Sequence, residues 1–367
     1  MNARNNSIKE NDSMARVNKN EMEFNFDDFD FDSLASDAFG SSVITAKLNP
    51  SIQGKVFTVY GNNNTGKTKQ CSRMVKNSFI IPLEAGTNGI SGNKILRTAS
   101  WADFRKHVRT LTSNKQMLKA LENGVEIGVI IDGLENGAMY CKQYICDQNN
   151  VDKIAQIPHG GGWAEYEQEM HTQITKLSKC GYTLFFIGHQ APAKDGGGYL
   201  DLAVDKRTAK PVKDISDFVI YVESNGVDEN GKVIPSSAFL AEHKGEDGFF
   251  ARSRFSYVDT YFEEWNAEII KQAIHDGIVK QAEAEGAELV TFLEENEKYE
   301  STFDLSHEDA LEAIFDMLDE ADEKGLGDKA DDILLTYLAS VDAVKDLTGK
   351  QMQTIQSIHD DLKVLLD

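Results

Sequence analysis

The segment from Gly61 to Thr68 constrains this chain more than any other, because its letters G-N-N-N-T-G-K-T fit the pattern G-x-x-x-x-G-K-T. Residues 55–60 before it are apolar, β-branched and aromatic, which predicts a buried strand, and residues 69–76 after it predict the start of a helix. A strand, a glycine-rich turn and a helix N-terminus surround an anion with backbone N–H groups and the positive end of the helix dipole. The segment therefore predicts a phosphate-binding loop rather than a chance match in an ordinary turn.

The residues of this loop have separate expected roles. Lys67 can reach the β and γ phosphates of a nucleotide, and the Thr68 hydroxyl can bind Mg²⁺. Asparagine tolerates left-handed backbone better than most residues, which suits a tight loop. ATP and Mg²⁺ are the expected cofactors. The expected nucleotide-binding residues are Gly61, Asn62, Asn63, Asn64, Thr65, Gly66, Lys67, Thr68 and Lys69.

Three further strands are predicted to end in polar side chains. Residues 128–132 are an apolar run that ends in Asp132, which is expected to hold Mg²⁺ through water. Residues 79–84 end in Glu84, which could orient the attacking water as a general base, or could be a solvated acid at a strand end. Residues 183–187 precede His189 and Gln190, one of which is expected to sense the γ-phosphate unless both are loop residues without a ligand. Lys67, Glu84, His189 and Gln190 form the expected catalytic set, and Thr68 and Asp132 are the expected metal ligands.

Six cations follow these strands along the chain. Each could complete the site of a neighbouring subunit, contact DNA phosphates, or be a solvated surface charge. They are Lys206, Arg207, Lys210, Lys213, Arg252 and Arg254.

The charge of the chain, −22 over 367 residues, is unevenly distributed. Residues 1–45 carry 4 Lys/Arg and 9 Asp/Glu, residues 46–264 carry 26 and 25, and residues 265–367 carry 8 and 26. The chain as a whole would repel nucleic acid, so any DNA contact must come from a local basic surface on the middle segment. These changes in composition divide the chain into three expected parts at 45/46 and 264/265.

The middle segment alternates predicted strands and helices, which indicates the α/β class with a mainly parallel sheet covered on both faces. Helices are expected near residues 101–111 and 163–180, where apolar residues recur at helical spacing. The expected strands are residues 55–60, 78–83, 127–131, 183–187, 217–222 and 249–255.

The two ends of the chain have a different character. Residues 1–45 are expected to be a disordered acidic tail, and the alternation of acid and Phe at 21–32 indicates either a docking motif or a tail kept soluble by charge. The C-terminal part is expected to be helical, with caps at Ser306 and Thr348. Met352, Ile355, Ile358, Leu362 and Leu365 then form one apolar stripe, which predicts a packing face in a small helical subdomain.

Cysteine usage and hydropathy indicate where in the cell the protein is expected to act. Four cysteines without a C-x-x-C pair indicate reduced thiols rather than a zinc site. With no signal peptide and no long apolar run, the chain is expected to be soluble and cytoplasmic, with no membrane partner.

Taken in order, the motifs G-N-N-N-T-G-K-T, F-I-I-P-L-E, V-I-I-D, G-G-G-W-A-E-Y and L-F-F-I-G-H-Q resemble the RecA-like ATP-binding proteins of bacteriophages, a group that includes ATP-dependent single-strand annealing recombinases. The resemblance covers residues 48–260. It implies a RecA-like P-loop NTPase core in residues 46–264, self-assembly into a homo-oligomer, and single-stranded DNA as a partner in recombination or replication in the cytoplasm of a bacterial host. It also implies that Glu84 is the catalytic carboxylate and that His189 or Gln190 couples ATP to DNA.

The chain departs from this family in two respects. Its C-terminal part is strongly acidic, and the loop at residues 194–200, where such proteins contact DNA, is only mildly suited to that task. An ATP-switched interaction protein, such as a replication loader or assembly factor with protein partners at its acidic tails, is therefore an alternative. A small-molecule phosphotransferase is a third possibility, although no Arg-rich lid is evident.

Overall fold

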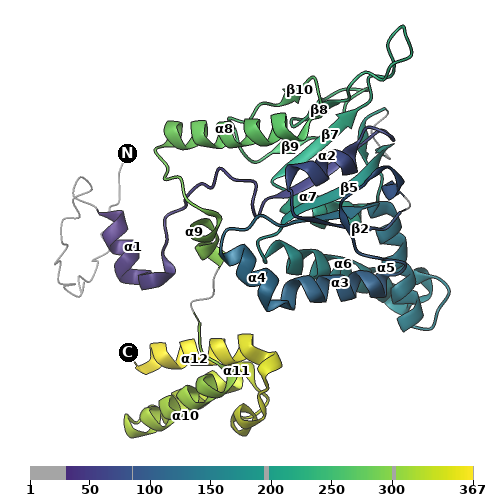
Figure 1. The fold of residues 1–367 in the computed structure, drawn as a ribbon. Coiled ribbons are helices and arrows are strands. Elements are labelled where there is room, and N and C mark those ends of the chain that lie inside the picture. Colours follow the sequence, from purple (N-terminus) through teal and green to yellow (C-terminus); the bar gives the residue numbers. More distant parts are fainter. Residues whose placement is uncertain (1–29, 85, 194–197, 300–302, 367) are drawn as a thin grey trace, which may run out of the picture. The chain divides into compact units, whose positions relative to one another are not determined.

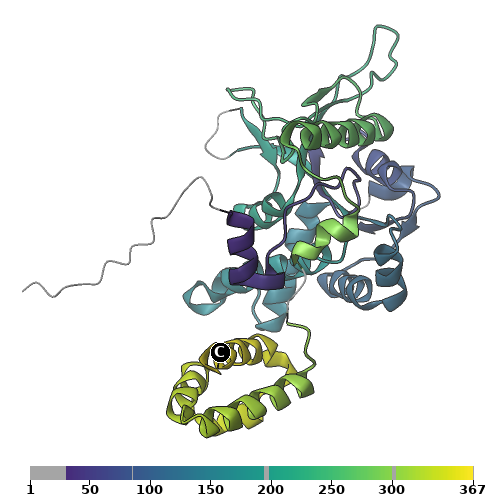
Figure 2. The same ribbon diagram turned by 90° about the vertical axis from the view of Figure 1, so that its left-hand side faces the viewer.

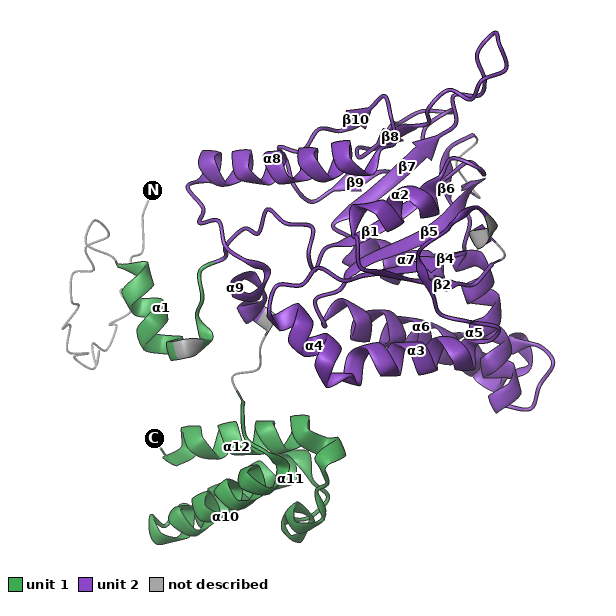
Figure 3. Cartoon of the chain, in the orientation of Figure 1, with its two compact units in different colours: residues 1–45, 302–367 green, residues 46–301 purple. Residues whose placement is uncertain are grey.

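The computed structural model describes residues 30–84, 86–193, 198–299 and 303–366 (Figure 1). The chain divides into two compact units, one formed by Ala46–Ser301 and the other by Met1–Thr45 with Thr302–Asp367 (Figure 3). The larger unit, unit 2 in Figure 3, contains the sheet and the candidate site, and each unit is described by itself.

The larger unit is built on one sheet with the order β10-β8-β7-β1-β5-β4-β2-β3. The pairs from β7 to β3 along this order are parallel, whereas β8, β10, β6 and β9 pair antiparallel with their neighbours. The predicted α/β class with a mainly parallel sheet is therefore confirmed. The strands are β1 (Val56–Gly61), β2 (Ser78–Pro82), β3 (Lys94–Ile95), β4 (Gly128–Asp132), β5 (Thr183–Pro192), β6 (Leu200–Leu202), β7 (Phe218–Glu223), β8 (Ser237–Phe239), β9 (Arg252–Ser253) and β10 (Tyr261–Phe262).

Helices cover both faces of this sheet, and the two views of the ribbon agree on their arrangement (Figure 1, Figure 2). On one face α2 (Lys67–Met74) and α8 (Ala267–Glu285) bury apolar side chains against Phe57, Phe185 and Phe218, whose rings stack across three strands. The opposite face is covered by α3 (Trp101–Ser113), α5 (Leu134–Gln148), α6 (Gly161–Ser178) and α7 (Lys206–Ile215). Because both faces are covered, the central strands are apolar throughout rather than alternating. Two shorter helices, α4 (Lys115–Glu122) and α9 (Phe292–Asn296), complete this unit.

Two expectations about this unit differ from the structure. The boundary expected at 264/265 lies inside the unit, because α8 buries Ala267, Ile270, Ile274 and Ile278 in the core of the sheet. The strand expected at 249–255 is reduced to the two residues of β9, which pair with the start of β7, while β8 pairs with its end. A change in net charge along the chain therefore does not mark the end of a domain when a helix beyond that change packs an apolar face against the sheet.

The smaller unit, unit 1 in Figure 3, has a core of its own in three C-terminal helices. They are α10 (His307–Glu323), α11 (Gly327–Tyr337) and α12 (Met352–Leu366). On α12 the predicted stripe is buried at Ile355, Ile358 and Leu362 and partly buried at its two ends. The side chain of Ser306 caps α10, and Thr348 with Gln351 forms the expected capping box before α12.

The N-terminal tail differs in part from the disorder expected of residues 1–45. Residues 31–39 form the helix α1 (Phe31–Phe39), which begins where the Asp30 carboxylate accepts a hydrogen bond from the Ser33 N–H. The acid and Phe alternation at 21–29 lies outside the described residues. No helix in the described parts of the chain is both long and apolar enough to cross a membrane. Cys71, Cys141, Cys146 and Cys180 are free thiols.

Candidate active site

The loop between β1 and α2 owes its shape to residues with positive φ. Asn64 has φ 60°, and Gly66, with φ 77°, caps the N-terminus of α2. Gly61 has φ 145°, and a Cβ placed there would lie 1.9 Å from the carbonyl oxygen of Val222. Only glycine allows β1 to leave the sheet this close to β7, so the loop conformation follows from the motif.

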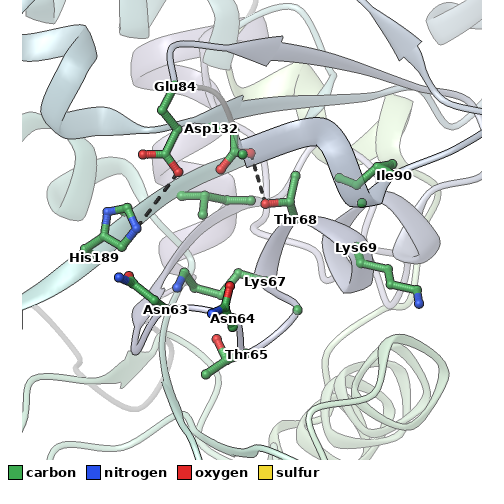
Figure 4. Close-up of a pocket in the computed structure, with 15 residues that line it drawn as sticks. Asn63, Asn64, Thr65, Lys67, Thr68, Lys69, Glu84, Ile90, Asp132 and His189 are labelled. Carbon is green, nitrogen blue, oxygen red and sulfur yellow. Dashed lines mark hydrogen bonds and ion pairs between the residues drawn. The ribbon is translucent and has the colours of Figure 1, made fainter.

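The loop places Lys67 and Thr68 at the first turn of α2. The Lys67 side chain is buried, and its Nζ donates to the carbonyl oxygens of Asn62 at 2.6 Å and Gly61 at 3.2 Å. Burial lowers the pKa of Lys67, and the nearby carboxylate of Asp132 opposes that shift. The Thr68 hydroxyl donates to Asp132 Oδ2 at 3.0 Å (Figure 4).

Asp132 is the last residue of β4 and is 1% exposed. Burial raises its pKa to about 6, against the hydrogen bond from Thr68. A hydroxyl and a carboxylate that already touch at a buried position are hard oxygen ligands of the kind that Mg²⁺ takes. The donor set at Thr68 and Asp132 therefore fits Mg²⁺.

The order of the strands brings Glu84 and His189 to the same edge of the sheet. Glu84 follows β2, His189 lies near the end of β5, and β4 with Asp132 runs between them. The His189 Nε2 lies 3.9 Å from Glu84 Oε1 (Figure 4). A Cβ at Gly133 would lie 2.8 Å from the Glu84 Cγ, so this glycine makes room for the carboxylate.

Glu135 is a site residue that sequence reasoning missed. It lies in the first turn of α5, three residues after Asp132, and its Oε1 accepts a hydrogen bond from the backbone N–H of His189 at 2.6 Å. Its Oε2 lies 3.5 Å from the ring nitrogen Nδ1 of His189. The signal available in the sequence was a second carboxylate just beyond the Asp that ends the strand.

These groups surround a pocket of about 410 Å³. It brings together most of the expected residues with five that were not predicted as site residues: Gly86, Gly89, Ile90, Ile187 and Gly188. The lining residues are Asn63, Asn64, Thr65, Gly66, Lys67, Thr68, Lys69, Glu84, Gly86, Gly89, Ile90, Asp132, Ile187, Gly188 and His189. Gly61 and Asn62 lie beside the pocket and accept hydrogen bonds from Lys67.

His189 and Gln190, which the sequence left as alternatives, differ in their position relative to the pocket. Successive residues of a strand point to opposite faces, and Gln190 is not among the residues that line the pocket. Its backbone pairs with Leu202 in the β5–β6 hairpin, and its buried amide oxygen has no hydrogen-bond partner in the described chain. Of the two residues, His189 is therefore the one that lines the pocket.

The six candidate cations do not line this pocket of their own subunit in the described chain. Arg252 donates to the carbonyl oxygens of Lys213 and Ser216, and Lys213 pairs with Asp201. On α7, Arg207 lies 3.8 Å from Glu167, and Lys210 pairs with Asp214. Lys206 begins the same helix and is exposed, and Arg254 is exposed and lies 3.7 Å from Asp217.

Three features together define a P-loop ATPase domain. They are the phosphate-binding loop at the edge of a parallel sheet, the Thr68–Asp132 pair beside it, and the Glu84 carboxylate at the end of the strand next to β4. Residues 53–255 match the family described as AAA domain, and the chain belongs to this family. The chain is also similar to the SPbeta prophage-derived uncharacterized protein YorG of Bacillus subtilis (strain 168). The two are 39% identical over 335 residues, which cover 91% of this chain and 99% of that relative. The more specific resemblance to RecA-like recombinases stays a prediction.

Proposed function

We propose that this protein is a phage-derived ATPase that binds and hydrolyses Mg-ATP in the pocket between the phosphate-binding loop and the ends of β2, β4 and β5. The observation that carries the proposal is the convergence of Lys67, the Thr68–Asp132 pair and Glu84 on one pocket of about 410 Å³. The 39% identity to a prophage-derived protein over nearly its whole length supports the phage origin and, with it, the cytoplasm of a bacterial host as the place of action.

Each residue has a distinct role in this proposal. The backbone N–H groups of residues 61–69 and the Lys67 ammonium hold the phosphates, and Thr68 and Asp132 hold Mg²⁺, which offsets phosphate charge. Glu84 takes a proton from the water that attacks the γ-phosphorus, while the bond to the β–γ bridging oxygen breaks and ADP and phosphate form. His189 faces the same end of the pocket, where it can report whether the γ-phosphate is present.

We infer further that ATP turnover serves a DNA transaction such as single-strand annealing, in a RecA-like homo-oligomer with a neighbour's cation completing each site. The resemblance of the motifs and the prophage relative support this role. Lys206, Arg207 and Arg254 are the exposed candidates for that cation, although Arg207 lies near Glu167 and Arg254 donates to the Asp214 carbonyl oxygen within the same subunit. Arg252 is half-buried and donates to two carbonyl oxygens of its own subunit.

A second candidate, an ATP-switched interaction protein, is favoured by the charge around the β5–β6 hairpin. Tyr199 donates to Glu242, and the exposed loop beside it carries Glu246 and Asp247. These carboxylates would repel DNA phosphates, and the acidic C-terminal helices offer a surface for a protein partner instead. Residues 194–197 of this hairpin lie outside the described residues.

ATP turnover by the purified protein, with and without single-stranded DNA, tests the proposal. We expect Mg²⁺-dependent turnover that DNA stimulates and that Lys67→Ala abolishes, because the cation that offsets phosphate charge is lost. Light scattering on the same samples measures self-assembly. Normal turnover by a folded Lys67→Ala protein would refute the site. Turnover without any effect of DNA would favour the interaction protein.

A further inference from the structure

Glu135 and Glu84 approach different nitrogens of the His189 ring, and one oxygen of each carboxylate and a ring nitrogen all lie within 4.8 Å of one another. Glu135 Oε1 accepts the His189 backbone N–H at 2.6 Å, and Glu135 Oε2 lies 3.5 Å from Nδ1. The other ring nitrogen, Nε2, lies 3.9 Å from Glu84 Oε1. Glu135 Oε2 is buried and has no hydrogen-bond partner in the described chain, and the ring nitrogen Nδ1 lies just beyond normal hydrogen-bond distance of it. A small rotation of the imidazole would complete that bond.

The backbone bond fixes where this carboxylate lies. Gly188 precedes His189 on β5, and a Cβ there would lie 3.0 Å from Glu135 Oε1 and 2.5 Å from the Leu202 Cδ1. The absence of a side chain at Gly188 therefore lets Glu135 reach across from α5 to β5. With one oxygen held by the strand, the second oxygen has a defined position beside the ring.

We propose that Glu135 is a positioning residue for ATP hydrolysis: it holds the His189 ring so that Nδ1–H faces Glu135 and Nε2 always faces Glu84 and the phosphate pocket. This inference rests on the function proposed above. Both carboxylates only accept hydrogen bonds, but Glu135 Oε2 is nearer to the ring, at 3.5 Å against 3.9 Å, and its carboxylate is anchored on the backbone of β5. The proton of the neutral ring is therefore held on Nδ1, and the charged ring keeps it there. The atom offered to the γ-phosphate end of the pocket is then the same in every state of the ring.

The variant Glu135→Gln distinguishes a positioning role of Glu135 from a purely structural role. The amide oxygen can still accept the His189 backbone N–H, but an NH₂ donor now faces Nδ1, so a neutral ring must place its proton on Nε2 instead. We expect kcat for ATP to fall about 10–100-fold, the range for partners that orient a functional histidine. ATP affinity should stay within a few-fold of wild type, and the unfolding temperature should change little.

Glu126→Gln is the matched control. Glu126 has a similar side-chain exposure, 31% against 23% for Glu135, and it bonds Lys271 and Ser51 just before β4 begins, at the far end of that strand from the pocket. Its kcat should equal that of wild type. Wild-type kcat in a folded Glu135→Gln protein would overturn the inference and leave the proposed ATPase function intact.

A double variant tests whether Glu135 acts through the ring. In a His189→Ala background the ring is absent, so adding Glu135→Gln should cause no further loss of kcat. A full additional loss would show that Glu135 acts elsewhere and would overturn the inference.

Nitrogen NMR of the His189 ring at pH 8 gives a readout that does not depend on activity. We expect the Nδ1–H tautomer in wild type and the Nε2–H tautomer in Glu135→Gln. The same tautomer in both proteins would overturn the inference even if Glu135→Gln were slow for another reason. If wild-type protein shows no turnover, the proposed function fails, and this NMR comparison alone decides whether Glu135 holds the ring.

Discussion

Asp132 is a residue at which stability and function oppose each other. Burial raises its pKa from 3.8 to about 6, so the fold favours the protonated form, whereas Mg²⁺ needs the carboxylate. The stability that this group contributes is present at low pH and is lost as the pH rises through about 6. At pH 8 and without nucleotide, the ionised side chain is expected to cost on the order of 2–3 kcal/mol.

Asp132→Asn should therefore raise the stability of the nucleotide-free protein at pH 8, because Asn cannot ionise and still accepts the Thr68 hydrogen bond. The gain should shrink as the pH falls below about 6. Thermal unfolding of both proteins between pH 5 and pH 8 measures it. A variant less stable than wild type at pH 8, or a difference independent of pH, would refute this explanation. The same substitution should weaken Mg²⁺-dependent ATP binding.

For single residues, the sequence was sufficient where the position of a side chain follows from the geometry of a parallel sheet. Parallel strands end at one edge of a sheet, so Glu84 and Asp132 could be expected near the loop without coordinates. The choice between His189 and Gln190 depended on which face of β5 each occupies, and the sequence did not show it. Glu135 was missed because a carboxylate in the first turn of a helix is common, and its contact with β5 exists only in three dimensions.

At the scale of elements, hydrophobic runs predicted the central strands well because both faces of the sheet are buried. The same reasoning failed for residues 249–255, which were expected to form a strand but of which only Arg252 and Ser253 pair with β7. Helix α8 was assigned to the acidic part of the chain, since net charge hides an apolar face that contacts the sheet. A deletion that tests the acidic region must therefore begin after Ser301 rather than near Trp265.

At the scale of the whole molecule, charge separates the two units. Residues 302–367 carry 17 Asp/Glu and 5 Lys/Arg, a net charge of −12, whereas the much longer segment 46–301 carries 34 and 29, a net charge of −5. A polyanion tethered to a DNA-binding unit competes with DNA phosphates, most strongly at low salt, where the Debye length is long.

Deleting residues 302–367 should therefore tighten single-stranded DNA binding, with the largest gain at low salt, while ATP turnover without DNA stays unchanged. DNA affinity as a function of salt, together with the native mass of both proteins, measures this effect. Weaker binding together with a loss of oligomers would instead place these helices in an assembly interface. If neither protein binds DNA at any salt, the annealing role is refuted.

The central claim is that this pocket hydrolyses ATP with Glu84 acting on the water, and Glu84→Gln tests it most directly. ATP binding and ATP turnover should be measured on the same folded protein in Mg²⁺. We expect ATP affinity close to wild type, because Glu84 is assigned no part in holding the phosphates or Mg²⁺, and turnover roughly 10²–10⁴-fold slower, the range for loss of a general base. Unchanged turnover would contradict the account and leave Glu84 with a structural role only.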